Sequence, residues 1–176
     1  MIRAAAAEDA GRLAEIDVLS SRYAYKDILS RECLYDDLTV PNRIPVWQKW
    51  IAERRFEIFV YEDPCAGSIR AMMGMGPCED EDQEGAFELH LLYVDPDDLR
   101  QGIGSDMLRF FERKGTERGC RRFVIWVLEE NAIGKAFYEK HGYLADGKDK
   151  LFRRWNKREI RYLKSTDENA APVNGL

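Results

Sequence analysis

Hydrophobic side chains follow two different spacings along the first part of the chain. Residues 2–4 are predicted to form a short first strand, and residues 8–28 carry apolar side chains at the three- and four-residue spacing of a helix. Pro41 and Pro45 are expected to punctuate a loop that leads into a second helix through Trp47. The chain is therefore predicted to begin with one strand and two helices.

The next segments are predicted to be extended. Residues 56–61 alternate apolar and polar side chains, which is typical of a half-buried strand. Pro64 and Gly67 indicate a turn, and residues 69–75 are expected to form the hairpin partner of that strand. Residues 79–84 hold five acidic side chains and are predicted to form a solvated loop.

Strands and helices then alternate. An apolar strand is predicted over residues 87–94, followed by a helix from Gly102 to about Arg118 that Gly119 would end. Residues 123–128 form an unbroken apolar run, as expected of a strand that is covered on both faces. The pattern therefore predicts a strand, a helix and a second strand.

The last part of the chain begins with another helix. Asn131 is expected to cap this helix, which would run to about His141. Residues 143–145 and 159–163 are predicted as two final strands joined by a basic loop, and residues 165–176 as a disordered tail. This mixed order of elements gives an α+β or α/β domain around one central sheet.

Length and charge narrow the class of protein. With 176 residues, a single domain over residues 1–164 is expected. The net charge of −5 argues against general affinity for nucleic acid or anionic membranes, and no stretch approaches the roughly 20 apolar residues of a membrane span. The four cysteines are widely spaced and are expected to be reduced, and with the two histidines they show no metal-ligand spacing. We therefore expect a cytoplasmic protein without a metal.

Residues 92–105, LYVDPDDLRQGIGS, carry the strongest functional signal. The predicted strand ends at Val94, a turn follows, and Gly102 and Gly104 open an amphipathic segment. The first N–H groups of a helix have no intrahelical partner and lie at the positive end of its dipole. Because glycine lets a ligand approach the backbone closely, this segment predicts a cradle for a phosphate or pyrophosphate.

This segment and NAIGKAFYEKHGY at residues 131–143 together resemble the GNAT superfamily of acyl-CoA-dependent N-acetyltransferases. The family loop reads Gln or Arg, two residues, Gly, one residue, then Gly or Ala. Leu99 stands where Gln or Arg is usual, and Arg100 is expected to supply the charge instead. The resemblance implies a mixed, twisted sheet of about seven strands flanked by about four helices, with acetyl-CoA as cosubstrate.

The resemblance also implies which residues bind the cosubstrate. In the family, the strand that ends at the position of Val94 binds the pantetheine arm through its backbone, and the loop and helix start wrap the pyrophosphate. One extra residue separates Asn131 from Ala136, so either Asn131 or Ala132 holds the family's Asn position, and Asn131 is favoured by its chemistry. The implied binding residues are Leu92, Tyr93, Val94, Arg100, Gln101, Gly102, Ile103, Gly104, Ser105, Asn131 and Tyr138.

Tyr138 is the candidate acid. The family uses this tyrosine to protonate the departing CoA thiolate. Asn131 and Tyr138 are seven residues apart, which places them near the same face of a helix. The alternative is that Tyr138 is a half-buried packing residue with a solvated hydroxyl.

The attacking amine must be neutral, so a base is also expected. At pH 7, a lysine-like amine costs about 4.6 kcal/mol to deprotonate and an α-amino group only about 1.4 kcal/mol. Glu88 and His90 are the candidates, and they alternate with Leu92 along one face of the strand. Some GNAT enzymes use a glutamate on this strand, which favours Glu88. For His90 the alternative is a histidine that is satisfied at the sheet surface.

Two charged segments bear on the acceptor. The acidic residues 79–84 would attract a cationic amine, whereas residues 148–164 hold eight basic side chains and would receive an acidic acceptor or a CoA phosphate. For both, the alternative is ordinary solvated surface. The resemblance predicts direct transfer to a primary amine of a small molecule or peptide in a ternary complex. The competing hypothesis is a non-catalytic acyl-CoA-binding or regulatory module. Dimers are common in the family, which makes a homodimer one candidate assembly.

Overall fold

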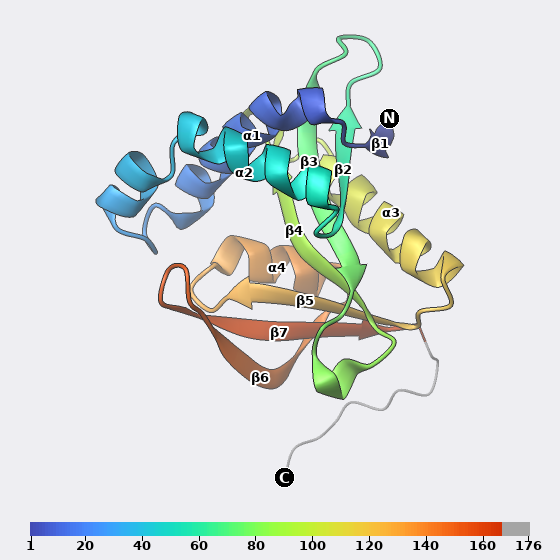
Figure 1. Ribbon diagram of the computed structural model, residues 1–176. Coiled ribbons are helices and arrows are strands. Elements are labelled where there is room, and N and C mark those ends of the chain that lie inside the picture. Colours follow the sequence, from blue (N-terminus) through green and yellow to red (C-terminus); the bar gives the residue numbers. More distant parts are fainter. Residues whose placement is uncertain (167–176) are drawn as a thin grey trace. The chain divides into compact units, whose positions relative to one another are not determined.

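The computed structural model describes residues 1–166, which contain one seven-stranded sheet in the order β1-β2-β3-β4-β5-β7-β6 (Figure 1). The strands are β1 Ile2–Ala4, β2 Glu57–Glu62, β3 Ile69–Pro77, β4 Phe87–Val94, β5 Arg122–Leu128, β6 Leu144–Phe152 and β7 Lys157–Ser165. The α-helices are α1 Ala10–Tyr25, α2 Val40–Glu53, α3 Ile103–Glu117 and α4 Ala132–Lys140. β4 pairs with β5 in parallel, whereas β2 and β7 pair with their neighbours in antiparallel fashion. The predicted mixed α/β class and the predicted order of elements are confirmed.

The described residues form two compact units. The first contains residues 1–76 and 90–111, and the second contains residues 77–89 and 112–166. β4 and α3 each pass from one unit into the other. No helix in the described part of the chain has the length and apolar character needed to cross a membrane.

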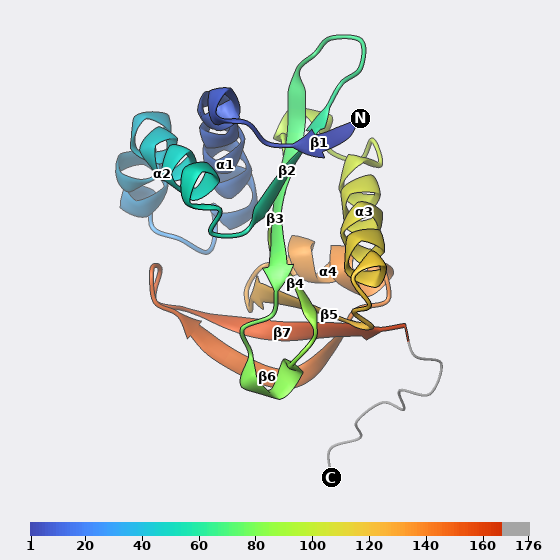
Figure 2. The ribbon, with the colours of Figure 1, turned by 45° about the vertical axis from the view of Figure 1, so that its right-hand side comes forward.

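In the first unit, α1 and α2 lie side by side (Figure 2). Their shared core includes fully buried Leu13, Ile16 and Trp47 together with Val60 and Met72 from the sheet. Two short turns flank α1 and precede α2: a 3₁₀ turn at residues 7–9 and a π-helical turn at residues 33–37. The buried face of α1 is the source of the three- and four-residue apolar spacing by which the sequence predicted this helix.

Pro41 and Pro45 lie inside α2, so the prediction of a loop at these residues is wrong. Pro41 lies in the first helical turn, where a backbone N–H would have no partner within the helix in any case. Pro45 lacks one ladder donor, but Trp47 anchors the same helix because it is fully buried and donates a hydrogen bond to Asp17 at 3.1 Å. Tertiary packing therefore outweighs the local preference.

The second unit contains the β5, β7 and β6 strands and the α4 helix. Phe87, Phe123 and Tyr143 are fully buried in it. Gly115 of α3 packs against two of these rings, because a Cβ added there would lie 2.6 Å from Phe123. The glycine thus lets the helix approach the sheet closely.

β6 is much longer than the three-residue strand predicted over residues 143–145, and the predicted basic loop is mostly strand. β6 is an edge strand, and all of its residues except Phe152 are exposed. A strand that buries neither face shows no apolar alternation, so its pairing with β7 was not visible in the pattern. Ser165 ends β7, and residues 167–176 of the predicted disordered tail lie outside the described residues.

Candidate active site

The β4–α3 connection is the centre of the candidate site and lies in the first unit. β4 ends at Val94, a 3₁₀ turn covers residues 96–98, and α3 begins at Ile103. The Asp106 N–H donates the first helical bond, at 3.0 Å, to the Gly102 carbonyl. The N–H groups of Ile103 and Gly104 therefore precede the hydrogen-bond ladder of α3, at its positive end.

Glycine and exposure leave room for a ligand at this helix start. Gly102 has a φ of +84°, and a Cβ there would meet nothing within 4 Å. Arg100, Gln101 and Gly102 are exposed, whereas Ile103 is buried and anchors the helix. Buried Ile103 thus fixes the start of α3, and the exposed residues 100–102 before it leave room for a bound diphosphate.

Arg100 has an unusual backbone conformation. Its φ of +63° lies in the left-handed region, which non-glycine residues adopt at a cost. The exposed guanidinium follows Leu99, which is half-buried. The sequence prediction that Arg100 supplies charge in place of residue 99 stays a prediction, and its exposure agrees with that role.

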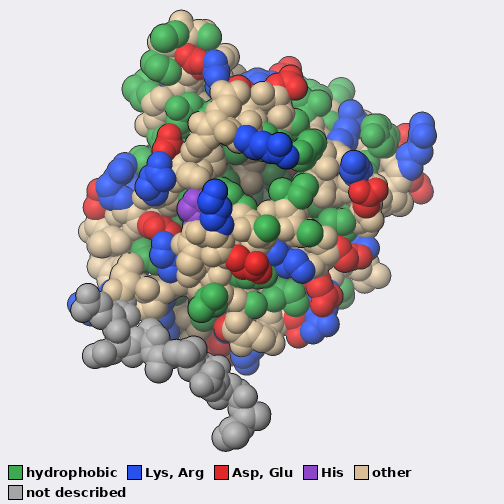
Figure 3. Space-filling view, turned by 180° about the vertical axis from the view of Figure 1, so that it is seen from behind, with side chains coloured by type: hydrophobic (Ala, Val, Ile, Leu, Met, Phe, Trp, Pro, Cys, Tyr) green, Lys and Arg blue, Asp and Glu red, His purple; other side chains and the backbone are tan. Residues whose placement is uncertain are grey.

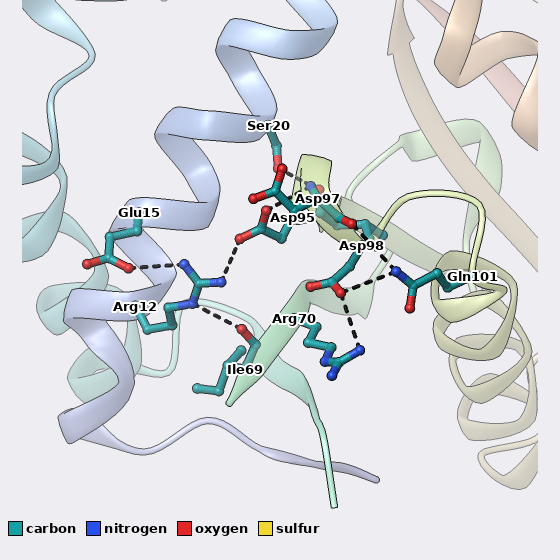
Figure 4. Close-up of polar contacts among 10 residues, drawn as sticks. Arg12, Glu15, Ser20, Ile69, Arg70, Asp95, Asp97, Asp98 and Gln101 are labelled. Atoms are coloured by element: carbon teal, nitrogen blue, oxygen red, sulfur yellow. Dashed lines mark hydrogen bonds and ion pairs between the residues drawn. The ribbon is translucent and has the colours of Figure 1, made fainter. Parts of the chain in front are cut away.

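Contacts from α1 hold the end of β4 (Figure 4). The Ser20 hydroxyl donates to the Val94 carbonyl at 2.8 Å. Asp95 is buried and its carboxylate accepts from the Asp97 N–H at 3.0 Å, which closes the turn. Sequence reasoning missed Ser20 because a serine on a long amphipathic helix carries no local signal of what it contacts.

Tyr93 connects β4 to a buried polar group that the sequence also did not reveal. Asp17 accepts hydrogen bonds from Arg43 at 2.5 Å and from Trp47 at 3.1 Å. Burial raises the pKa of Tyr93 well above its usual value, and the neighbouring Tyr25 and Asp17 raise it further. Tyr93 therefore stays protonated and keeps a hydroxyl donor inside this unit.

Asn131 is the N-cap of α4 and Tyr138 lies within that helix, both in the second unit. The Asn131 side chain caps the helix, as predicted, by accepting from the Gly134 N–H at 3.0 Å. Tyr138 is buried in the last turn of α4, and its ring packs edge-on against Phe137 and Tyr143. The packing of the Tyr138 ring agrees with the alternative that Tyr138 is a packing residue. Its role as an acid stays a prediction.

The two candidate bases have different surroundings. Glu88 is buried in the second unit, where its charge acts on Cys78 and Glu159. Burial raises the pKa of Cys78 to about 12, and the Glu88 carboxylate contributes. Burial also raises the pKa of Glu159, Lys150 opposes this shift, and the charge of Glu88 adds to it. The charge of Glu88 therefore favours the protonated forms of both Cys78 and Glu159.

His90 belongs to the first unit and is half-buried. Its ring lies 5.3 Å from the ring of Phe56, and a Cβ on Gly76 would be 3.4 Å from its Nε2 atom. The His90 side chain therefore packs closely against Phe56 and Gly76.

The acidic loop at residues 79–84 is exposed over most of its length, as the sequence predicts, but two of its carboxylates are also paired. Asp80 and Asp82 bind Arg161 of β7 at 3.0 and 2.6 Å. The Arg161 hydrogen bond is the main cause that lowers the pKa of Asp82 to about 2. These carboxylates serve an internal ion-pair network, which the sequence could not show because Arg161 lies far along the chain.

Several basic side chains at the C-terminal end of the segment 148–164 are also paired within the protein. Lys157 binds Glu130 and Lys164 binds Glu112, both at 2.8 Å, and Arg158 binds Asp149 at 2.9 Å. In Figure 3, acidic and basic side chains are interspersed over the face that it shows. These pairs reduce the net charge that the segment can offer to an acceptor.

Comparisons with known proteins agree on one family. A family model described as the acetyltransferase (GNAT) family matches residues 22–143. The uncharacterized N-acetyltransferase YuaI of Bacillus subtilis (strain 168) is 28% identical over 130 residues, which cover 74% of this chain and 72% of that protein.

Solved structures share the fold. The PaiA N-acetyltransferase of Thermoplasma acidophilum, in complex with coenzyme A, has a TM-score of 0.74 at 18% identity, covering 92% of this chain and 96% of that one. YncA of Salmonella typhimurium, a putative acetyltransferase with acetyl-CoA, has a TM-score of 0.62 at 19% identity, covering 99% and 98%. With the family model spanning more than half of its length, the chain belongs to the acetyltransferase (GNAT) family and is an acyltransferase.

Proposed function

We propose that this enzyme transfers an acetyl group from acetyl-CoA to a primary amine of a small molecule or peptide. The observation that carries the proposal is the start of α3, where the glycine cap at Gly102 leaves the backbone N–H groups of Ile103 and Gly104 ahead of the helical ladder. PaiA and YncA, which share the fold, were crystallised with coenzyme A and acetyl-CoA respectively.

Each part of the cosubstrate has proposed partners in this chain. The backbone of Leu92, Tyr93 and Val94 would bind the pantetheine arm. Residues 100–105 would bind the diphosphate through their N–H groups and the Arg100 charge. Asn131 serves as the α4 cap and would reach the cosubstrate only through the remaining capacity of its amide.

The proposed reaction is direct attack. The amine nitrogen forms a bond to the thioester carbonyl carbon, the carbon–sulfur bond breaks, and the sulfur leaves as a thiolate. Glu88, or a water that it polarises, takes the proton that the amine gives up. Tyr138 donates a proton to the thiolate, whose pKa near 8.5 makes it a moderate leaving group. A backbone N–H near Val94 would polarise the carbonyl.

A thiol-release assay with acetyl-CoA and a panel of amines tests this proposal. The panel should contain polyamines, amino acids, aminoglycosides and peptides with free N-termini. We expect release of coenzyme A that depends on one class of amine, with a rate that rises with pH as the acceptor loses its proton. Calorimetric binding of acetyl-CoA without turnover on any amine would instead favour the non-catalytic module, and no binding at all would reject both.

A further inference from the structure

Arg12 reaches from α1 to the turn that follows β4 (Figure 4). Its Nη2 atom lies 2.5 Å from Oδ2 of Asp95, and its Nε atom donates to the Ile69 carbonyl at 3.0 Å. Its Nη1 atom binds Glu15 one helical turn further along α1, at 3.0 Å. A single guanidinium thus joins the first helix, the start of β3 and the end of β4.

Asp95 passes this restraint into the turn. Its Oδ1 atom accepts from the Asp97 N–H at 3.0 Å, and its backbone carbonyl accepts from the Asp98 N–H at 2.9 Å. Its own N–H donates to the Arg70 carbonyl at 2.8 Å. Every polar group of Asp95 is therefore used, and Arg12 fixes the oxygen that does not close the turn.

The restraint continues toward the helix start. Asp98 accepts from Arg70 at 3.3 Å, and Arg70 also binds Asp63. Gln101 reaches back to Asp98 and to the Asp97 carbonyl at 3.5 Å each. Gln101 immediately precedes Gly102, so the chain of contacts ends at the backbone proposed to bind the diphosphate.

Charge gives a second reason for this arrangement. Asp95, Asp97 and Asp98 place three carboxylates directly before a backbone that would bind an anion. Burial alone would lower the pKa of Arg12, but its hydrogen bonds with Asp95 and Glu15 outweigh this and raise it. Arg12 therefore stays charged and neutralises the buried carboxylate, which would otherwise repel a diphosphate.

We propose that Arg12 is a positioning residue for acyl-CoA: through Asp95 it fixes and neutralises the turn that presents the α3 N-terminus to the diphosphate. This inference rests on the proposed function. Arg12 touches neither the reacting atoms nor the phosphate-binding backbone in this proposal and acts only through Asp95.

Coenzyme A affinity, measured by titration calorimetry, tests the role of Arg12. We expect Arg12→Gln to weaken binding by about tenfold, because small displacements of binding groups are costly. Arg12→Lys keeps the charge but loses the fork geometry, so its affinity for coenzyme A should lie between that of the natural protein and that of Arg12→Gln. The double variant Arg12→Gln/Asp95→Asn restores neutrality without the restraint, so it should recover only the part of the affinity that is lost through charge, and full recovery would contradict a positioning role.

Arg3→Gln is the matched control. Arg3 binds Asp9 at 2.7 Å, and the pair has exposed side-chain fractions of 31% and 7%, against 32% and 8% for Arg12 and Asp95. It lies in the same unit but ties β1 to the start of α1. We expect Arg3→Gln to lower the melting temperature as much as Arg12→Gln does, with unchanged coenzyme A affinity.

The outcomes separate the two proposals. If the natural protein does not bind coenzyme A, the proposed function fails and this inference fails with it. If it binds, but Arg12→Gln binds equally well, the inference alone is overturned. Equal loss of affinity in Arg3→Gln and Arg12→Gln would also overturn it, because both changes would then act through general loosening of the unit. Where Arg12→Gln does not fold, Arg12→Lys and the double variant decide the question.

Discussion

The Arg161 guanidinium binds the Asp82 carboxylate through two parallel hydrogen bonds of 2.6 Å each. Arg161 also contacts Asp80 and Asp146, at 3.0 and 2.7 Å, and only 3% of its side chain is exposed. One buried cation therefore holds the acidic loop, β6 and β7 together. Two carboxylates of the acidic segment that would attract an amine, Asp80 and Asp82, thus also anchor the second unit.

This pairing predicts how stability depends on acid. The pKa of Asp82 is lowered from 3.8 to about 2 in the folded protein, mainly by the Arg161 hydrogen bond. A group with a lowered folded pKa contributes stability that is present above the unfolded pKa and is lost as the pH falls through the folded pKa. The melting temperature should therefore fall between about pH 4 and pH 2, and Asp82→Asn should flatten this part of the curve. Circular dichroism melts across this range measure it, and identical slopes would contradict the assignment.

Gly102 is predicted to matter for binding beyond its effect on stability. Alanine at a φ of +84° is strained by about 1 kcal/mol, and its methyl group would lie on the surface that we propose to face the diphosphate. We expect Gly102→Ala to weaken coenzyme A binding about tenfold, by calorimetry. Gly119→Ala is the control, since Gly119 has a φ of +82° and equally open surroundings. It should cost similar stability without changing affinity, and a shared loss of affinity would count against a special role for Gly102.

Tyr138→Phe is expected to lower turnover by about a hundredfold while the affinity for acetyl-CoA stays nearly constant, because only proton donation is removed. Steady-state kinetics on the best amine of the panel measure both quantities. Tyr143→Phe is the matched variant in the same unit, because the Tyr143 hydroxyl donates to Glu112 at 3.0 Å. That change should cost about 1 kcal/mol of stability and leave turnover unchanged. Unaltered turnover in Tyr138→Phe would reject the acid role.

Glu88→Gln and His90→Gln distinguish the two candidate bases. If Glu88 takes the amine proton, Glu88→Gln should reduce turnover at pH 7 by about a hundredfold and regain activity as the pH approaches the pKa of the amine. His90→Gln should then leave the pH profile in place. The reverse pattern, with the profile altered only by the histidine change, would assign the base to His90.

The sequence pattern was sufficient to predict features that depend only on residues close together in the chain. β4 has the bounds predicted from its apolar run, Asn131 caps α4, and Gly119 follows α3 with a positive φ. Capping and glycine turns are decided within a few residues, so sequence alone reveals them. The GNAT resemblance rested on such segments, and the family model confirms it.

The remaining features depend on partners that are distant in sequence. Pro45 is tolerated inside a helix because Trp47 is buried against elements far from it. Arg12 looks like an ordinary residue of a polar helix face, and only the fold brings it to Asp95, 83 positions later. The supports of the candidate site were therefore hidden, whereas its glycine-rich backbone was visible.

β6 has a consequence for how the protein behaves at high concentration. It forms an open margin of the sheet, with Leu144 and Leu151 exposed, and such a margin is a template for unwanted pairing with another chain. Its register shifts between Ala145 and Asp149, and Gly147 has a φ of +84° within that irregular stretch. The distorted backbone presents an uneven row of hydrogen-bonding groups, so we expect the irregularity to disfavour fibre-like self-association.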